Sequence, residues 1–416
     1  MPNVERSVWS RILRAGRSSP SIAAIALLLA GCSTPDEPSS EGIELGLLLP
    51  FTGADSATSS NFERAVLFAL RGVNAGGGIG GRPLRVVSAD THSDPARARS
   101  SLDQLVDAGV SVVIGPESAD IAAQIAPELA SRGVAFLSPL VGAAEDANVD
   151  CSVPWFRLAP SAKTLGDALA KQLSAEAIQR VAILYEPRAY EQAMRSAVGN
   201  RFKALGGTVA LEQELDPQAQ GYGSAVLSAI QADVQAVVLA TSPRTAALVV
   251  NDYRASSPVL PRWFLSPLLK TELLLANVPP EVLEGAIGVA PKIYERSREF
   301  VAEFAHYWEG DEPLEGAYFY YDAVGLLALA LQRTALNHDG QIELKNLDSA
   351  VLQTATTRGV SVGWNEIASG LARVADGGNT YYSGLTGPLL LDSCGPRTLG
   401  ASTVWRIEGG VIVESE

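Results

Sequence analysis

The sequence predicts an α/β protein with two lobes, each of them a doubly wound and mostly parallel sheet covered by helices. Short apolar runs typical of buried strands alternate with longer segments in which apolar residues recur at helical spacing. This alternation occurs twice, first over residues 43–137 and again over residues 164–266. The chain has 416 residues, which is more than one hydrophobic core usually holds. Two lobes are therefore expected.

The first lobe begins with an apolar run that is followed by an amphipathic helix. Ser60 and Glu63 have the spacing of a capping box at the start of this helix, and glycines from Gly76 end it. Asp94-Pro95 opens the next helix. The expected strands are 43–49, 84–88, 110–114 and 134–137, and a third helix begins at about residue 118.

The second lobe repeats this pattern after an apolar segment at 155–158. Its expected helices are 164–176, 190–205, 223–231 and one after residue 244, and its expected strands are 181–185, 209–213, 236–240 and 263–266. The remainder is predicted to be helical over 295–336 and Gly-rich over 376–387, with strands at 388–392, 403–408 and 411–413.

Residues 1–31 have the features of a lipoprotein signal peptide. Four arginines precede an apolar stretch at 22–30, which is too short to span a hydrocarbon core of about 30 Å. The stretch runs into Leu29-Ala-Gly-Cys32, which resembles a bacterial lipobox with Cys32 as the acylated residue. Residues 32–41 offer no apolar side chain to a core and predict a flexible tether. The expected location is the periplasmic side of the cell envelope, with a lipid on Cys32 as the membrane anchor.

Charge and cysteine content restrict the partners. After residue 31 the chain has 28 basic and 45 acidic residues, a net charge of −17, which repels a phosphate backbone, so no nucleic-acid partner is expected. With Cys32 acylated, Cys151 and Cys394 remain. Two thiols in an oxidising compartment favour a disulfide between them.

Three motifs could indicate catalysis, cofactor binding or metal binding, but the residues around each of them do not fit that function. Residues 359–363 match G-x-S-x-G around Ser361, but no histidine follows to complete a triad, so a loop is expected. Residues 76–81 contain G-x-G-x-x-G between a helix and a strand, which is the reverse of a dinucleotide fingerprint. Residues 90–94 offer three possible metal ligands that an extended segment cannot close around an ion, so a strand end and helix cap are expected. No enzymatic activity, cofactor or metal site is predicted.

An ordered set of segments resembles the type I periplasmic solute-binding proteins, the leucine/isoleucine/valine-binding family of ABC transporter receptors. The segments are Gly46-Leu-Leu-Leu-Pro-Phe-Thr-Gly53, Val73-Asn-Ala-Gly-Gly-Gly-Ile-Gly-Gly-Arg-Pro-Leu84, Ile114-Gly-Pro-Glu-Ser118, Phe136-Leu-Ser-Pro139, Glu284-Gly285 and Ala317-Tyr-Phe-Tyr-Tyr-Asp-Ala-Val324. The resemblance implies the two-lobed type I fold with three hinge crossings, near Arg157, Gly288 and Gly387. The implied first lobe comprises 42–157 and 289–386, and the second lobe 158–288 and 387–416.

The resemblance also implies a ligand site between the lobes, at the carboxyl ends of the strands. Its expected residues are Phe51, Thr52, Ser118, Ala119, Leu140, Val141, Gly142, Tyr190 and Ser266. The family holds an amino acid with a serine and a threonine, and Ala119 and Leu140 with Gly142 stand at those positions here. Glu191 replaces the usual glycine beside the cleft tyrosine, Tyr190. These departures favour a neutral or cationic ligand over a free branched-chain amino acid.

Two functions are compatible with these observations. The first is a lipid-anchored solute-binding protein that captures a small molecule and delivers it to an ABC permease. The second is a ligand-free lipoprotein of the same fold that binds another protein of the envelope. A permease gene nearby would favour transport, and a cleft filled by side chains would favour the protein-binding alternative.

Overall fold

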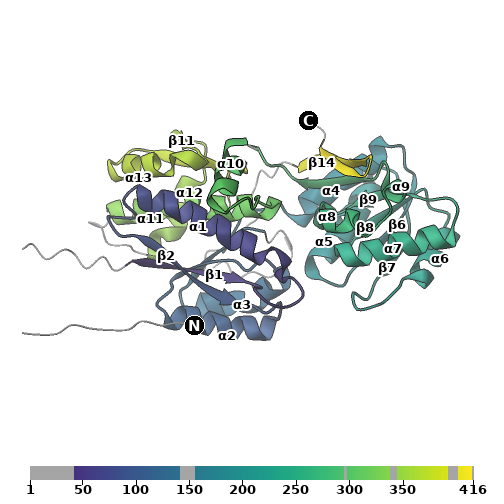
Figure 1. The fold of residues 1–416 in the computed structure, drawn as a ribbon, viewed down its shortest axis with the longest axis horizontal. Helices are drawn as coiled ribbons and strands as arrows, with labels where there is room; N and C mark the ends of the chain where they lie inside the picture. Colours follow the sequence, from purple (N-terminus) through teal and green to yellow (C-terminus); the bar gives the residue numbers. More distant parts are fainter. Residues whose placement is uncertain (1–41, 141–154, 295–297, 338–343, 392–401, 415–416) are drawn as a thin grey trace, which may run out of the picture. The chain divides into compact units, whose positions relative to one another are not determined.

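The computed structural model describes residues 42–140, 155–294, 298–337, 344–391 and 402–414. Two large sheets dominate this part of the chain, one of five strands and one of seven (Figure 1). We call the five-stranded sheet with its helices the first lobe and the seven-stranded sheet with its helices the second lobe. The chain passes between the two lobes three times: after β5 (Trp155–Arg157), after β10 (Ile287–Pro291), and between β13 (Gly387–Pro388) of a small third sheet and β14 (Ser402–Glu408).

The first sheet is entirely parallel and has the order β2-β1-β3-β4-β5. The chain starts in the middle of the sheet and winds outward in both directions, so β1 and β3 flank the switch point. Its strands are β1 (Ile43–Leu49), β2 (Leu84–Asp90), β3 (Val112–Ile114), β4 (Ala135–Ser138) and β5 (Trp155–Arg157).

The second sheet repeats this winding and adds two antiparallel strands at one edge. Its order is β15-β14-β10-β9-β8-β6-β7, with its switch point between β6 and β8. Pairing is parallel from β7 to β10, and β14 and β15 join antiparallel. The strands are β6 (Arg180–Tyr185), β7 (Thr208–Glu214), β8 (Ala236–Ala240), β9 (Arg262–Leu265), β10 (Ile287–Pro291), β14 (Ser402–Glu408) and β15 (Val411–Glu414).

Helices bury an apolar face on each side of both sheets. In α1, for example, Phe62, Val66 and Val73 are almost fully buried and share one helical face. One core of the first lobe contains α1 and α10–α13 and the other contains α2 and α3. In the second lobe α4 and α5 pack on one face and α6–α9 on the other. The helices are α1 (Ser59–Ala75), α2 (Pro95–Asp107), α3 (Ala119–Ser131), α4 (Ala162–Ala175), α5 (Ala189–Ala204), α6 (Gly223–Gln231), α7 (Pro243–Ser256), α8 (Glu272–Leu275), α9 (Pro280–Leu283), α10 (Arg298–Tyr307), α11 (Glu315–Asn337), α12 (Leu347–Thr354) and α13 (Ile367–Ala375), with 3-10 turns η1 (Ser56–Thr58), η2 (Pro267–Leu269), η3 (Leu344–Asn346) and η4 (Trp364–Glu366).

The long helix α11 is tied to a small third sheet by a buried carboxylate. This sheet consists of β11 (Val360–Val362), β12 (Thr380–Gly384) and β13 (Gly387–Pro388). Asp322 of α11 is completely buried and accepts four hydrogen bonds. The donors are the Tyr382 hydroxyl at 2.9 Å, the Leu385 amide at 2.9 Å, and the Thr386 amide and hydroxyl at 2.7 and 2.6 Å. These bonds fix the segment from which the chain continues toward β14.

Some local predictions are confirmed and others are wrong. Asp94 caps α2 by accepting hydrogen bonds from the amides of Ala96 and Arg97, as expected. The capping box is wrong, because α1 begins at Ser59 without a side-chain cap and Glu63 accepts a hydrogen bond from Ser88 instead.

Two predicted loops or strands also differ from the structure. Ser361 lies in the short strand β11 and not in a loop, although it is exposed. Of the strand expected at 388–392, residues 388–391 are described, and among these only Pro388 lies in a strand, β13, which pairs with β12. Gly288 lies inside β10, so the second crossing follows Pro291.

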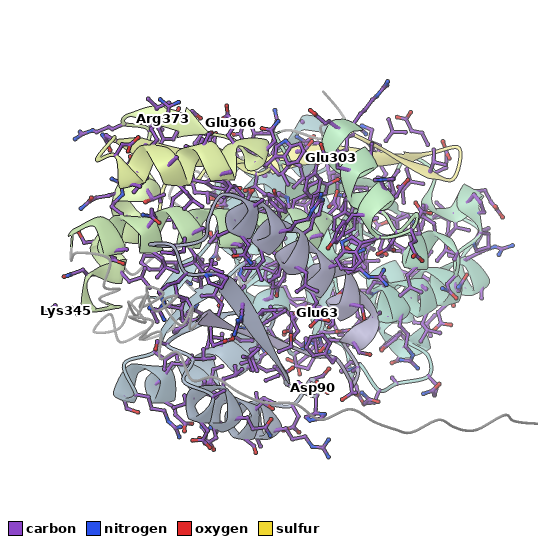
Figure 2. The ribbon with its side chains drawn as sticks, turned by 60° about the vertical axis from the view of Figure 1, so that its left-hand side comes forward. Glu63, Asp90, Glu303, Lys345, Glu366 and Arg373 are labelled. Atoms are coloured by element: carbon purple, nitrogen blue, oxygen red, sulfur yellow. The ribbon has the colours of Figure 1, made fainter. Side chains whose placement is uncertain are left out.

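Charged side chains lie on the outer faces of the helices, as Glu303, Glu366 and Arg373 show (Figure 2). None of the described helices combines the length and apolarity that spanning a membrane requires. Cys32, Cys151 and Cys394 lie outside the described residues, so the lipid anchor and the disulfide stay predictions.

Candidate functional site

The loops after β1 and β3 flank the switch point of the first sheet, where parallel sheets usually bind ligands. Two glycines bring these loops close to their neighbours. Gly115 has a φ of 109°, and a Cβ there would collide with the Leu48 carbonyl oxygen. Gly53 has a φ of 98°, and a Cβ there would collide with the carbonyl of His92. Side chains larger than hydrogen are excluded at both positions, so the loop that carries Glu117 stays against β1.

A network of hydrogen bonds joins the loop after β1 to the end of β2. Asp90 is the last residue of β2 and lies at the tip of that strand (Figure 2). The Thr52 hydroxyl lies 2.7 Å from the Asp90 carboxylate and 2.7 Å from Nδ1 of His92. Burial raises the pKa of Asp90, but the hydrogen bonds from Thr52 and the His92 amide outweigh it and lower the pKa below the ordinary value. Thr52 is therefore engaged within its own lobe.

Glu117 has no comparable partners. It follows β3 at the switch point, its two carboxyl oxygens are shielded from solvent, and neither accepts a hydrogen bond from another described residue. Its pKa is raised to about 8, chiefly by burial. The carboxylates of Asp55 and Asp90 add to this effect, whereas a hydrogen bond with its own backbone and the charge of Arg188 oppose it. The Tyr320 hydroxyl of α11 is also buried without a partner in this part of the chain. Burial raises the pKa of Tyr320 well above its usual value, and the Glu117 charge adds to the effect.

The second lobe places polar side chains at the corresponding switch point. Glu186 follows β6 and is fully buried. It accepts hydrogen bonds from the hydroxyl and amide of Ser242 at 2.6 and 3.2 Å, through one of its two oxygens. Thr241 and Ser266 follow β8 and β9, are at most 1% exposed, and have hydroxyl groups with no described partner. Unpaired polar atoms thus gather at the carboxyl ends of the strands in this lobe as well.

The beginning of α5 adds an aromatic and an acidic side chain. Tyr190 is half-buried beside the core of α4 and α5, and burial raises the pKa of its hydroxyl. Glu191 is 2% exposed, and one of its carboxyl oxygens has no described partner. Burial raises the pKa of Glu191 to about 7, whereas the nearby Arg188 lowers it.

Three contacts join the carboxyl-end loops of the two lobes. Arg188 donates from both terminal nitrogens to one oxygen of Asp55, at 3.2 and 3.3 Å. The Ala189 amide donates to Asp120 of α3 at 3.3 Å. Lys270, whose side chain is 5% exposed, is bonded to Glu315 at the start of α11 and to Glu414 of β15.

All seven of the expected site residues that the structure describes lie at these carboxyl ends. Phe51, Thr52, Ser118, Ala119 and Leu140 lie there in the first lobe, and Tyr190 and Ser266 in the second. Val141 and Gly142 lie outside the described residues. Sequence reasoning did not include Asp90, Glu117, Arg188 and Tyr320 among the expected site residues.

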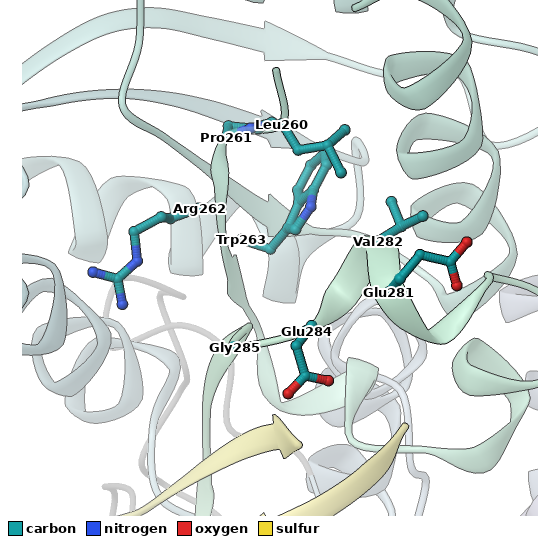
Figure 3. Close-up of a pocket in the computed structure, with 8 residues that line it drawn as sticks. All are labelled: Leu260, Pro261, Arg262, Trp263, Glu281, Val282, Glu284 and Gly285. Carbon is teal, nitrogen blue, oxygen red and sulfur yellow. The ribbon is translucent and has the colours of Figure 1, made fainter. Parts of the chain in front are cut away.

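Two hollows on the described surface lie elsewhere. One of about 300 Å³ is lined by residues 260–263 before and within β9 and by residues 281, 282, 284 and 285 before β10 (Figure 3). The other, of about 280 Å³, is lined by glycines of 76–81 with Gln332 and part of α13. Both lie near the amino ends of strands, away from the polar groups described above. The described residues include no group of three or more His, Cys, Asp or Glu side chains arranged to hold a metal ion.

Comparisons with known proteins agree with this geometry. A model of the family described as periplasmic binding protein matches residues 42–365. Leu/Ile/Val-binding protein homolog 2 of Brucella abortus (strain 2308) is 23% identical over 308 residues, which cover 73% of this chain and 81% of that protein.

Solved structures share the two-lobed fold. The leucine binding protein LivK from Thermotoga maritima MSB8 has a TM-score of 0.73 at 16% identity, covering 90% of this chain and 98% of that one. An ABC transporter solute binding protein from R. palustris, in complex with benzoate, has a TM-score of 0.69 at 18% identity and covers 90% and 95%.

Proposed function

This chain belongs to the periplasmic binding protein family, and we propose that it is a lipid-anchored solute-binding protein that captures a small molecule between its lobes for an ABC permease. The proposal rests on one observation: the loops at the switch points of the two sheets contact each other. Arg188, next to the unpaired groups of the second lobe, bonds Asp55 beside those of the first. A ligand held there would contact both lobes and stabilise their association.

The ligand need not be a branched-chain amino acid. The related structures carry names that refer to leucine in one case and benzoate in another, so this fold accepts different chemistries. Here Ala119 and Leu140 offer no hydroxyl to a ligand carboxylate. Each lost charge-assisted hydrogen bond is worth about 1.5 to 3 kcal/mol. We therefore propose that leucine, isoleucine and valine bind with dissociation constants weaker than about 1 μM, or about −8 kcal/mol.

A protein-binding role without a ligand is the second candidate. One observation favours it: Arg188 of the chain itself supplies a positive charge among the carboxylates of Asp55, Glu117 and Glu191. In this case the lobes would be held together without any solute.

Thermal-shift screening of the purified protein against a metabolite library distinguishes the two candidates. A ligand present at 100 times its dissociation constant adds about 2.7 kcal/mol to the free energy of unfolding, which is readily detected. Stabilisation by a small molecule, confirmed by isothermal titration, supports solute capture. If no compound stabilises the protein and an envelope protein co-purifies with it, the second candidate is favoured.

A further inference from the structure

Glu117 and Tyr320 are buried polar groups that receive no hydrogen bond from any other described residue. The carboxyl oxygens of Glu117 and the hydroxyl of Tyr320 are all shielded from solvent. Strands β3 and β4 pair in parallel with Ile114 opposite Leu137, so Glu117 and Leu140 stand three residues beyond paired positions on adjacent strands. Leu140 and Phe62 both adjoin Gly316, and Phe62 stacks on Tyr320, so the same neighbourhood contains Tyr320. The charge of Glu117 also raises the pKa of Tyr320. They belong to different elements, the loop after β3 and helix α11, and both lie in the first lobe.

The lack of hydrogen bonds to these two side chains is unusual, because roughly nine in ten or more buried polar groups in proteins are hydrogen-bonded. A buried carboxylate without a partner is among the least favourable arrangements in a protein. The Arg188 charge lowers the pKa of Glu117, but its terminal nitrogens donate to Asp55 and give Glu117 no hydrogen bond. The chemistry that would satisfy Glu117 is a group that brings several N–H donors and a positive charge.

The surroundings also select against an anion. Asp55 and Asp90 act on Glu117 from the loop after β1 and from the end of β2, and both are acidic. An apolar surface adjoins the pair: Phe62 stacks on Tyr320 with ring centroids 4.9 Å apart. A Cβ placed on Gly316, near Phe62, would lie 3.0 Å from the Leu140 side chain.

We propose that Glu117 and Tyr320 form a subsite that binds the protonated amine of a small ligand, whose apolar part lies against Leu140. The Glu117 carboxylate accepts two N–H bonds from the ammonium group, and the Tyr320 oxygen accepts a third. This inference rests on the proposed function of solute capture and assigns the class of solute, a primary amine with an apolar body.

Compounds that bind in the metabolite screen are sorted by their charge. Two amines, isoamylamine and benzylamine, are added as cationic probes. The carboxylates isocaproate and benzoate serve as their anionic counterparts. Dissociation constants are measured by isothermal titration for wild type, Glu117→Gln, Tyr320→Phe and Glu299→Gln. Glu299 is exposed on α10 and serves as the matched control. We expect amines to bind, with affinity at least tenfold weaker in Glu117→Gln, three- to tenfold weaker in Tyr320→Phe, and unchanged in the control.

Two further measurements separate this role from a structural one. Both Glu117→Gln and Tyr320→Phe remove an unpaired buried polar group or its charge, so ligand-free melting temperatures should not fall. Amine affinity should increase at least tenfold from pH 6 to pH 8 in wild type, because a glutamate with a pKa of about 8 becomes ionised there. The Glu117→Gln variant should lack most of this increase. The other charged groups that act on the pair, Asp55, Asp90 and Arg188, are retained in both proteins.

The possible failures can be told apart. If bound compounds are mainly anions, or if Glu117→Gln binds amines as tightly as wild type, the amine subsite is wrong and solute capture stands. If no compound of any class binds wild type, the proposed function fails and the inference fails with it.

Discussion

Asp322 and Glu117 are two buried carboxyl groups with opposite surroundings. Asp322 accepts four hydrogen bonds, and Glu117 accepts none from another described residue. Burial raises the pKa of both, but the hydrogen bonds of Asp322 oppose this effect. The first group is satisfied by hydrogen bonds within the fold, whereas the second receives none from another described residue. This difference separates a structural carboxylate from a candidate binding residue.

Replacing Asp322 with asparagine should destabilise the protein strongly. The amide would turn an N–H₂ group toward donors that now point at a carboxylate, and each unsatisfied buried donor costs about 1 to 3 kcal/mol. We expect a loss of roughly 2 to 4 kcal/mol in the free energy of unfolding, measured by urea denaturation. Tyr382→Phe removes one of the donors and should cost less. An unchanged urea midpoint for Asp322→Asn would contradict the importance of this network.

The Glu117 carboxyl should make stability depend on pH. Between the ordinary glutamate pKa and about 8 the folded protein keeps a proton that the unfolded chain has released. The stability of wild type should therefore fall as pH rises through this range. One pKa unit corresponds to about 1.4 kcal/mol, so Glu117→Gln should be more stable than wild type at pH 8.5 by roughly 1 to 3 kcal/mol.

Denaturation of wild type and Glu117→Gln at pH values from 5 to 9 checks this dependence. The difference between the two proteins isolates Glu117 from Glu191, whose pKa is also raised by burial. A difference that stays constant with pH would show that Glu117 is ionised throughout. Glu299→Gln, in which an exposed carboxyl is lost, should follow wild type at every pH.

For single residues, the sequence predicted their places in the fold better than their hydrogen bonds and neighbours. Thr52 and Ser266 were expected at the ends of strands and are found there. The hydrogen bonds of Thr52 could not be predicted, because they depend on residues distant in the chain, such as Asp90. Tyr320 was part of a recognised segment, but its proximity to Glu117 follows from the packing of α11 and not from any local pattern.

The loop between β6 and α5 connects the second lobe to the first. It carries Arg188 and Ala189, which bond Asp55 and Asp120 of the first lobe. Burial lowers the pKa of Arg188, but the carboxylates of Asp55, Glu191 and Glu186 outweigh this and keep the guanidinium charged. Because Arg188 and Asp55 are both partly exposed, this ion pair should contribute less than about 1 kcal/mol to global stability.

The same ion pair should matter more for the association of the lobes. We expect Arg188→Ala to lower the free energy of unfolding by less than about 1 kcal/mol and to increase the radius of gyration of the ligand-free protein, measured by small-angle X-ray scattering. Arg254→Ala is a suitable control, since Arg254 pairs with Glu281 inside the second lobe. Identical scattering from wild type and Arg188→Ala would show that Arg188 does not hold the lobes together.

Elements were predictable where their periodicity was strong. The strands at 43–49 and 236–240 have the expected bounds, since buried parallel strands are continuous apolar runs. The capping box at Ser60 failed because Glu63 has a competing partner, Ser88, on β2. The strand β5 was not recognised as part of the first sheet, because a run of three residues carries almost no periodicity.

At the scale of the whole molecule, repetition of one pattern was enough to predict two lobes. The order of the strands could not be predicted in the same way, because it depends on which strands pair. The structure shows this pairing and the matching switch points of the two sheets. The surplus of acidic residues keeps such a protein away from anionic surfaces. The membrane anchor that we propose, a lipid on Cys32 of the lipobox-like segment, would hold the protein at a membrane without any attraction between charges.

Replacing Cys32 with alanine should release the protein from the membrane. The thiol is the proposed site of acylation, and each buried CH₂ of an acyl chain contributes about 0.8 kcal/mol to membrane binding. We expect Cys32→Ala to accumulate as unprocessed precursor or as soluble protein after cell fractionation and a carbonate wash, with loss of labelling by a fatty-acid analogue. Cys151→Ser provides the matched control, because it removes a thiol but leaves the proposed acylation site intact. Processed Cys32→Ala protein that remained in the washed membrane would show that another segment anchors the chain.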